Sequence, residues 1–303
     1  MGEAKVTAWL TRPVNVRWFH QACGVFPAAV FVSLFIFIPL TYAINVSMTN
    51  YRWGIPGGFA GLNNYLKVIR TAAFSNALYI TLKLLVITLP AVLTVSFVFA
   101  LILQRPFPGN TLILLALLIP YSIPGSIDAA MWRWLYDPRN GIVQYLASLL
   151  GFLPHGSALL GSPNTALYAI ILAYVWKFTP YTTFIILAAL KSLPTEIFDA
   201  ARLDCNCWQS FLYVTIPLLK PVIFVTLSLQ TIFILTMHFS LVYVLTGGGP
   251  VGATTTLAYF VFLRSFEDLN FGEGSALAIF LALIMMLFII IYYVFLTKAR
   301  QEI

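Results

Sequence analysis

Five of the few charged side chains in this apolar chain gather in one short segment. They are Glu196, Asp199, Arg202, Asp204 and Lys220, all between Pro194 and Pro221. Charges are costly in hydrocarbon, so this segment lies outside any membrane. Pro194 suits a first helical turn, and carboxylates after it suit the helix dipole. Helical spacing puts Ala200, Ala201 and Asp204 on one face. The pattern predicts a small, acidic docking surface for another protein.

A second set of side chains could bind a polar, ring-shaped solute. Helical spacing places four of them on one stripe of an apolar run: Tyr174, Lys177, Phe178 and Tyr181. Sugars offer CH surfaces to aromatic rings and hydroxyls to donors and acceptors, and tyrosine supplies both partners. From neighbouring runs we add Tyr121, Thr231 and His238. Ordinary packing between helices is the alternative for each residue.

Lys177 is a charge inside an apolar run, where it costs about 2.5–3.5 kcal/mol at mid-helix. It therefore faces either a partner or a wet cavity. One interpretation is an anion site. The interpretation we favour is a lysine that only has to be neutralised, with Asp128 as a conceivable partner.

The sequence lacks patterns for catalysis or metal binding. No Gly-x4-Gly-Lys-Ser/Thr loop for nucleotide phosphates occurs, and no nucleophile, base and orienting group are set together. Cys205 and Cys207 form a Cys-x-Cys pair without further ligands nearby, which is weak evidence for metal. We expect a chain that is not an enzyme and binds no metal or cofactor. If ATP and Mg²⁺ drive its function, another polypeptide holds them.

Composition predicts an all-α membrane protein. The 303 residues are 60% hydrophobic and 9% charged, with a mean hydropathy of +0.91. About 20 apolar residues span a bilayer core. Six runs are long enough: 22–48, 76–104, 110–134, 165–191, 217–246 and 272–297. They divide the chain into an N-terminal segment 1–21, a six-helix domain 22–297 and a C-terminal tail 298–303.

Charge sets the expected orientation. If both termini are cytoplasmic, nine Lys and Arg residues lie inside and six outside, in line with the positive-inside rule. The charged loop 192–216 is then cytoplasmic. The net charge of +7 suits anionic membrane lipid, so no nucleic acid is needed as a partner.

The charged loop resembles the "EAA" loop of ABC importer permeases. The family pattern is roughly Glu-Ala-Ala-x-x-Asp-Gly-Ala, an aromatic, Ile/Leu-Pro and a second Pro. Here the segment Asp199-Ala-Ala-x-x-Asp204 matches it, with Phe211, Pro217 and Pro221 following. Asp199 replaces the usual Glu. Cys205 replaces the usual Gly, which would cost about 1–2 kcal/mol in a left-handed bend, so we expect Asn206 to take that bend.

Further motifs are similar to those of sugar-type importer permeases. They are Phe59-Ala-Gly-Leu-Asn-Asn-Tyr65, Ile119-Pro-Tyr121, Trp176-Lys-Phe-Thr-Pro-Tyr181, and Thr246-Gly-Gly-Gly-Pro250 followed by Thr254-Thr-Thr-Leu257. Each is weak alone, but their order and spacing extend the resemblance from about residue 25 to the C-terminus.

The resemblance implies a type I ABC importer permease fold with a coupling loop between helices 4 and 5, in a bacterial or archaeal plasma membrane. It implies as partners a second permease, a dimer of ABC ATPase subunits and an extracellular or periplasmic binding protein. The ATPase-coupling contacts would be Glu196, Asp199, Ala200, Ala201 and Asp204. The expected cargo is a mono-, di- or oligosaccharide, with glycerol 3-phosphate or its diesters as the alternative. An ion-coupled secondary transporter would want inverted repeats and several intramembrane carboxylates. A membrane-embedded enzyme is the weaker rival.

Overall fold

The protein consists of helices joined by loops in the part that its computed structural model describes, residues 16–301 without 54, 56 and 153–156. Three single π-helical turns lie between α-helices, at Ser33–Phe37, Phe211–Thr215 and Leu263–Glu267. The helices are α1 (Val16–Val32), α2 (Ile38–Ser47), α3 (Asn63–Ile69), α4 (Ala72–Gln104), α5 (Asn110–Ser122), α6 (Gly125–Leu135), α7 (Ile142–Leu149), α8 (Pro163–Ser192), α9 (Thr195–Asp204), α10 (Cys207–Ser210), α11 (Ile216–Leu245), α12 (Leu257–Phe262) and α13 (Phe271–Gln301).

Five helical runs are long and apolar enough to cross a membrane: 24–47, 72–104, 163–192, 208–245 and 271–295. A sixth span is the pair α5 and α6, which are bent by 99° at their junction. The apolar run predicted over 110–134 is therefore present, but it forms two helices with a sharp bend between them. Pro124 is the physical reason. A residue before proline avoids the helical region, and Ile123 is extended, with φ −76° and ψ 128°.

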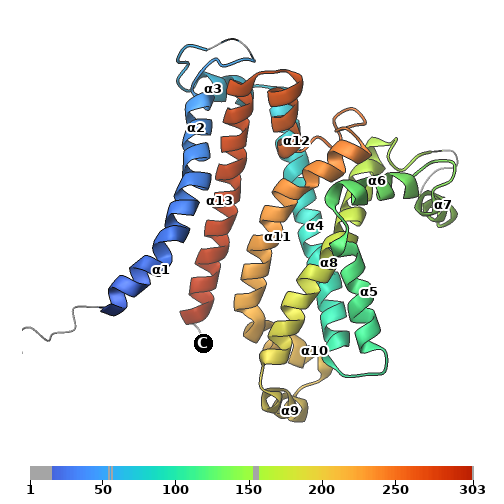
Figure 1. Cartoon of the computed structure of the whole chain (residues 1–303). Coiled ribbons are helices and arrows are strands. Elements are labelled where there is room, and N and C mark those ends of the chain that lie inside the picture. The colour runs from blue at the N-terminus through green and yellow to red at the C-terminus, as the bar shows by residue number, and fades with distance from the viewer. Residues whose placement is uncertain (1–15, 54, 56, 153–156, 302–303) are drawn as a thin grey trace, which may run out of the picture.

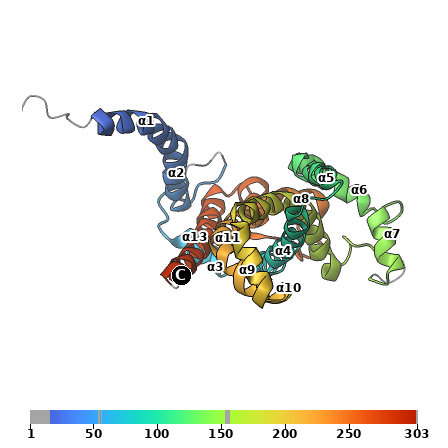
Figure 2. The ribbon, with the colours of Figure 1, turned by 90° about the horizontal axis from the view of Figure 1, so that it is seen from below.

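The core lies where α4, α8 and α11 meet. Its largest fully buried side chains include Tyr174, Ile170 and Leu84, and Ser96 Oγ donates across the interface to the Thr179 carbonyl at 3.1 Å. In Figures 1 and 2, α13 flanks this core on one side, while α5, α6 and α7 extend on the other. In the first span, α2 packs against α13, whereas α1 leans away from the bundle. None of this span's most apolar stretch is buried within the chain.

The end of the bundle opposite α9 is closed by hydrogen-bonded loops. Thr246 and Thr254 share a hydroxyl hydrogen bond of 2.7 Å, and Thr255 Oγ1 donates to the Gly248 carbonyl at 3.0 Å. Gly248 has φ +79°, and a Cβ there would lie 2.6 Å from Thr255 Oγ1, so both conformation and space require glycine. The threonine hydroxyls thus stabilise the turn that contains the Gly-Gly-Pro motif.

Candidate functional site

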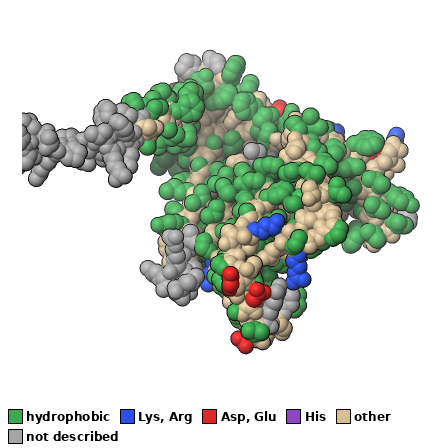
Figure 3. Space-filling view, turned by 60° about the horizontal axis from the view of Figure 1, so that its bottom comes forward, with side chains coloured by type: hydrophobic (Ala, Val, Ile, Leu, Met, Phe, Trp, Pro, Cys, Tyr) green, Lys and Arg blue, Asp and Glu red, His purple; other side chains and the backbone are tan. Residues whose placement is uncertain are grey.

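The charged loop folds into a helix that caps one end of the molecule. α9 begins directly after Pro194 and carries exposed Glu196, Asp199, Ala200 and Asp204, while Ala201 is half-buried. Figure 3 shows acidic atoms gathered at this end, with basic atoms nearby on a surface that is otherwise mostly hydrophobic. The five predicted coupling residues therefore lie together on one short helix, four of them on its open side.

The bend after α9 differs from the prediction. Cys205 is extended, with φ −125° and ψ 142°, and its N–H donates to the Ala201 carbonyl at 2.9 Å. Among the described residues, the only non-glycine positions with positive φ are Val251 and Leu269, so Asn206 is not left-handed. Asn206 instead caps α10. Its Oδ1 accepts from Gln209 N–H at 2.9 Å, and Gln209 Oε1 accepts from Asn206 N–H at 3.0 Å.

Apolar side chains stand exposed beside these acids. Leu203 is 86% exposed, Trp208 75% and Tyr213 74%. Trp208 lies edge-on to Phe211, 6.4 Å between ring centroids. A mixed surface of small, acidic and large apolar side chains suits contact with another protein better than contact with lipid, because lipid would leave the carboxylates unsatisfied.

The predicted stripe on α8 splits into an inner and an outer part. Tyr174 is fully buried, and its hydroxyl donates to Gln230 Oε1 at 3.0 Å; Gln230 Nε2 in turn donates to Thr182 Oγ1 at 2.7 Å. This relay joins α8 to α11. Phe178 stacks on Tyr174 at a centroid distance of 4.2 Å. Gln230 was not predicted as part of this site. The signal that could have identified it is that it is a lone amide side chain inside an apolar run.

The outer part of the stripe forms an aromatic platform, which we define as Tyr121, Phe178, Tyr181 and Phe233. Tyr121 and Tyr181 stack with centroids 5.4 Å apart and planes 19° apart. Phe233 lies 5.6 Å from both Phe178 and Tyr181. Tyr121 is 42% exposed and Tyr181 half-buried. The platform therefore brings three predicted residues together and leaves ring surface open.

Lys177 is neutralised within the chain. Its ammonium lies 3.2 Å from Asp128 Oδ2 and donates to the Ile123 carbonyl at 2.6 Å, and both charged side chains are largely buried. The Ile123 carbonyl lies at the break between α5 and α6, where the helix no longer supplies its donor. Lys177 thus donates to the broken backbone, as non-helical backbone at membrane depth requires, and neutralises the charge of the buried carboxylate.

Two predicted residues do not join the platform. Thr231 is fully buried on the α13 side of α11, where its hydroxyl shares a hydrogen bond of 3.0 Å with Tyr292. Its side chain is therefore occupied in helix packing. The side chain of His238 lies outside the described residues.

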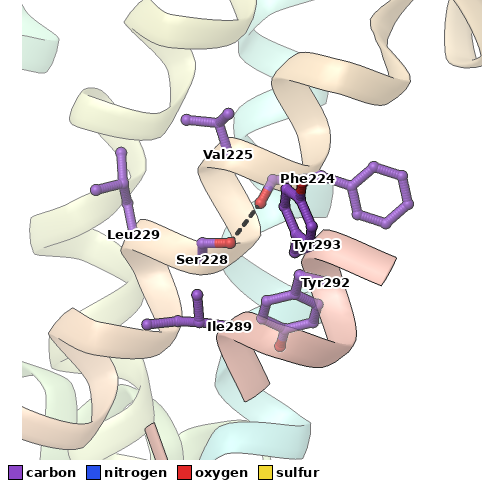
Figure 4. A pocket seen from close by; sticks show the side chains of 7 residues that line it. All are labelled: Phe224, Val225, Ser228, Leu229, Ile289, Tyr292 and Tyr293. Carbon is purple, nitrogen blue, oxygen red and sulfur yellow. Dashed lines mark hydrogen bonds between the residues drawn. The ribbon is translucent and has the colours of Figure 1, made fainter. Parts of the chain in front are cut away.

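A groove lies between α11 and α13 (Figure 4). It is lined by Phe224, Val225, Ser228, Leu229, Ile289, Tyr292 and Tyr293. No predicted solute-binding residue lines it. Ser228 Oγ already donates to the Phe224 carbonyl at 2.9 Å, so this groove offers a polar solute little beyond the tyrosine hydroxyls. Across the described part of the chain, no three His, Cys, Asp or Glu side chains are grouped to hold a metal.

Comparisons with known proteins agree with this architecture. Residues 17–301 match the family model described as binding-protein-dependent transport system inner membrane component. A trehalose/maltose transport system permease protein, MalF, of Thermococcus litoralis is 34% identical over 271 residues, which are 88% of this chain and 90% of that protein. An sn-glycerol-3-phosphate transport system permease protein, UgpA, of Rhizobium meliloti is 29% identical, covering 85% of this chain and 87% of its own.

The fold also matches a solved structure. A chain of a bacterial ABC transporter involved in the import of the acidic polysaccharide alginate superposes with a TM-score of 0.77. The match covers 93% of this chain and 96% of that one at 19% identity, so the likeness concerns the fold. The broken α5–α6 span, the exposed helix α9 and the long matches in sequence and fold lead to one conclusion. The chain belongs to the family of binding-protein-dependent transport system inner membrane components.

Proposed function

We propose that this chain is one of two permease subunits of an ATP-driven importer and that its solute is a neutral sugar. The aromatic platform carries the proposal, because stacked, half-exposed tyrosines offer ring faces and hydroxyls at one place. The trehalose/maltose relative supports the same class of solute. The second permease would complete the path opposite the platform.

The buried ion pair separates this proposal from an anion site. The Rhizobium meliloti relative is named for the transport of an anionic solute, sn-glycerol 3-phosphate. Such a solute would need a free cation in the path. Lys177 is the cation nearest the platform on α8, and Asp128 with the Ile123 carbonyl already engages it. Transfer of Lys177 to a phosphate would leave Asp128 buried and unpaired, at a cost of several kcal/mol. We therefore rank the neutral sugar first.

α9 is the proposed docking point for a separate ATPase, which would bind ATP and Mg²⁺ in place of this chain. The exposed carboxylates and the neighbouring exposed Leu203 and Trp208 support this. α13 ends at the same side as α9 (Figure 1), so a cytoplasmic C-terminus follows if α9 meets a cytoplasmic ATPase. ATP-driven closure of the ATPases would move α9 and turn the path from one side of the membrane to the other.

The coupling test uses a pair of substitutions at one position. We would co-purify the chain with its ATPase, second permease and binding protein, and measure ATP hydrolysis in proteoliposomes. Asp199→Lys should abolish stimulation by loaded binding protein while basal hydrolysis and assembly persist. Asp199→Glu keeps the charge and should retain stimulation. Normal stimulation in Asp199→Lys would remove α9 from coupling.

The solute test uses the platform. Tyr181→Ala should lower uptake of radiolabelled maltose or trehalose at least tenfold, and Tyr181→Phe, which keeps the ring, should lower it less. Uptake of glycerol 3-phosphate by the unaltered complex, without uptake of any sugar, would reverse the ranking. Unchanged sugar uptake in Tyr181→Ala would assign the platform to helix packing.

A further inference from the structure

The short helix α7 presents its apolar side outward. Ile142 is 59% exposed, Tyr145 65% and Leu149 68%, and their spacing of three and four residues puts them on one face with Leu146. Leu150 and Phe152 continue this exposed surface past the end of the helix, at 67% and 74%. We call these six side chains the α7 face.

The polar side of α7 points inward. Gln144 is 6% exposed, its Nε2 donates to the Ser157 carbonyl at 2.7 Å, and its Oε1 accepts from Leu159 N–H at 2.9 Å. These two bonds fix the rotation of the helix. A helix surrounded by water would point its apolar stripe toward the protein, so α7 is oriented for an apolar environment on its outer side.

The place of α7 in the fold indicates what that environment is. α5 has 13 residues, about 20 Å of helix, less than the roughly 30 Å of a bilayer core. The 99° bend then turns α6 sideways, and Figure 2 shows α6 and α7 extending outward from the bundle. The chain thus runs along the bilayer near its boundary instead of leaving it directly.

Residues around α7 match the composition of a membrane boundary. Trp134, at the end of α6, is 69% exposed, and Arg133 and Arg139 are exposed as well. Exposed Trp, Tyr and basic side chains next to an apolar stripe are typical of helices in the headgroup region. α7 itself carries no charge. In the turn before it, the N–H groups of Asn140 and Arg139 lower the pKa of Asp137 and fix the approach of the chain.

We propose that α7 is an interfacial anchor whose face lies in the boundary between headgroups and acyl chains, in the leaflet opposite α9. Lipid covers the α7 face, and the basic side chains nearby meet lipid phosphates. The anchor holds the outer end of α6 at a fixed depth, and the break that Lys177 spans lies at the other end of the same helix. The proposal requires a membrane-embedded bundle and is independent of which solute is carried.

The test is photo-crosslinking in the assembled importer. A benzoylphenylalanine replaces Tyr145 in one variant and Leu149 in another, and each complex is reconstituted with radiolabelled phospholipid. The control places the same group at Asn140, an exposed polar position in the preceding turn. Co-purification of all subunits checks that each variant assembles. Adducts are then separated into lipid and protein, with and without the binding protein.

The expected result is lipid adduct at 145 and 149 at least fivefold above that at 140, unchanged by the binding protein. A protein adduct at 145 or 149 would overturn the proposal, because the second permease or the binding protein would then cover the α7 face. Lipid labelling equal to that at 140 would also overturn it, since the face would then lie in water.

Discussion

Charged side chains are buried and paired in the interior around α8, whereas they are exposed on the helix α9. Lys177 and Asp128 are buried and neutralise each other's charge, and Lys177 also donates to the Ile123 carbonyl. Glu196, Asp199 and Asp204 are exposed at the end of the molecule. The first arrangement maintains the fold, whereas the second is open to another protein. If the chain works as we propose, the charges buried in it maintain the shape of the path, and the charges on α9 contact the ATPase.

Removing one member of the buried pair is the strongest way to test the comparison. Lys177→Met should destabilise the protein by about 3–5 kcal/mol, because Asp128 is left buried without its cation. Heating followed by fluorescence-detected size-exclusion chromatography measures the loss of folded protein. The control is Lys83→Met, which removes a cation 5.6 Å from the Tyr168 ring and should cost about 0.5–1 kcal/mol. Equal effects would show that the ion pair has no special role.

The relay between α8 and α11 tests whether buried neutral polar groups contribute in the same way. Tyr174→Phe removes the donor to Gln230 Oε1 and should cost about 1–3 kcal/mol. In Tyr181→Phe the lost hydroxyl is on a half-buried ring, and thermal stability should stay within about 0.5 kcal/mol of the unaltered protein. A larger loss at Tyr181 than at Tyr174 would contradict the inner and outer division of the stripe.

On the exposed side, changes should affect coupling more than folding. Asn206→Ala removes the cap of α10 and should cost about 1 kcal/mol of local stability. We expect faster proteolysis of the segment between α8 and α11, with the melting temperature of the bundle unchanged. A fall in the melting temperature as large as that of Tyr174→Phe would join this segment to the core.

The smallest effect is expected at Cys205. Cys205→Gly restores the residue usual in the family, yet Cys205 is extended, so no left-handed strain is relieved. Added freedom of the unfolded chain should make the variant slightly less stable, by under about 1 kcal/mol. A clear gain in stability would mean that the bend is left-handed in the assembled importer.

Several features were predictable because they depend on local sequence. Apolar length located the spans, and the cost of a buried charge identified Lys177 as needing a partner, with Asp128 as the candidate. The break at Pro124 was missed, since prolines occur in intact membrane helices as well and only packing decides the angle. Periodicity placed Thr231 on α11 but could not say which neighbour it faces. The prediction of a left-handed bend at Asn206 was wrong, because Asn206 caps α10 with its side chain instead.

The distance between Lys177 and Asp128 has an electrical consequence. A charge that moves through the membrane potential gains or loses about 2.3 kcal/mol per 100 mV. The ammonium and carboxylate are 3.2 Å apart and opposite in sign, so as one unit they carry no net charge. Translation of the α6–α8 junction during transport, with the pair keeping its orientation, then requires no work against the voltage. The rate at which the path opens should, as far as this pair is concerned, be the same in energised and de-energised membranes.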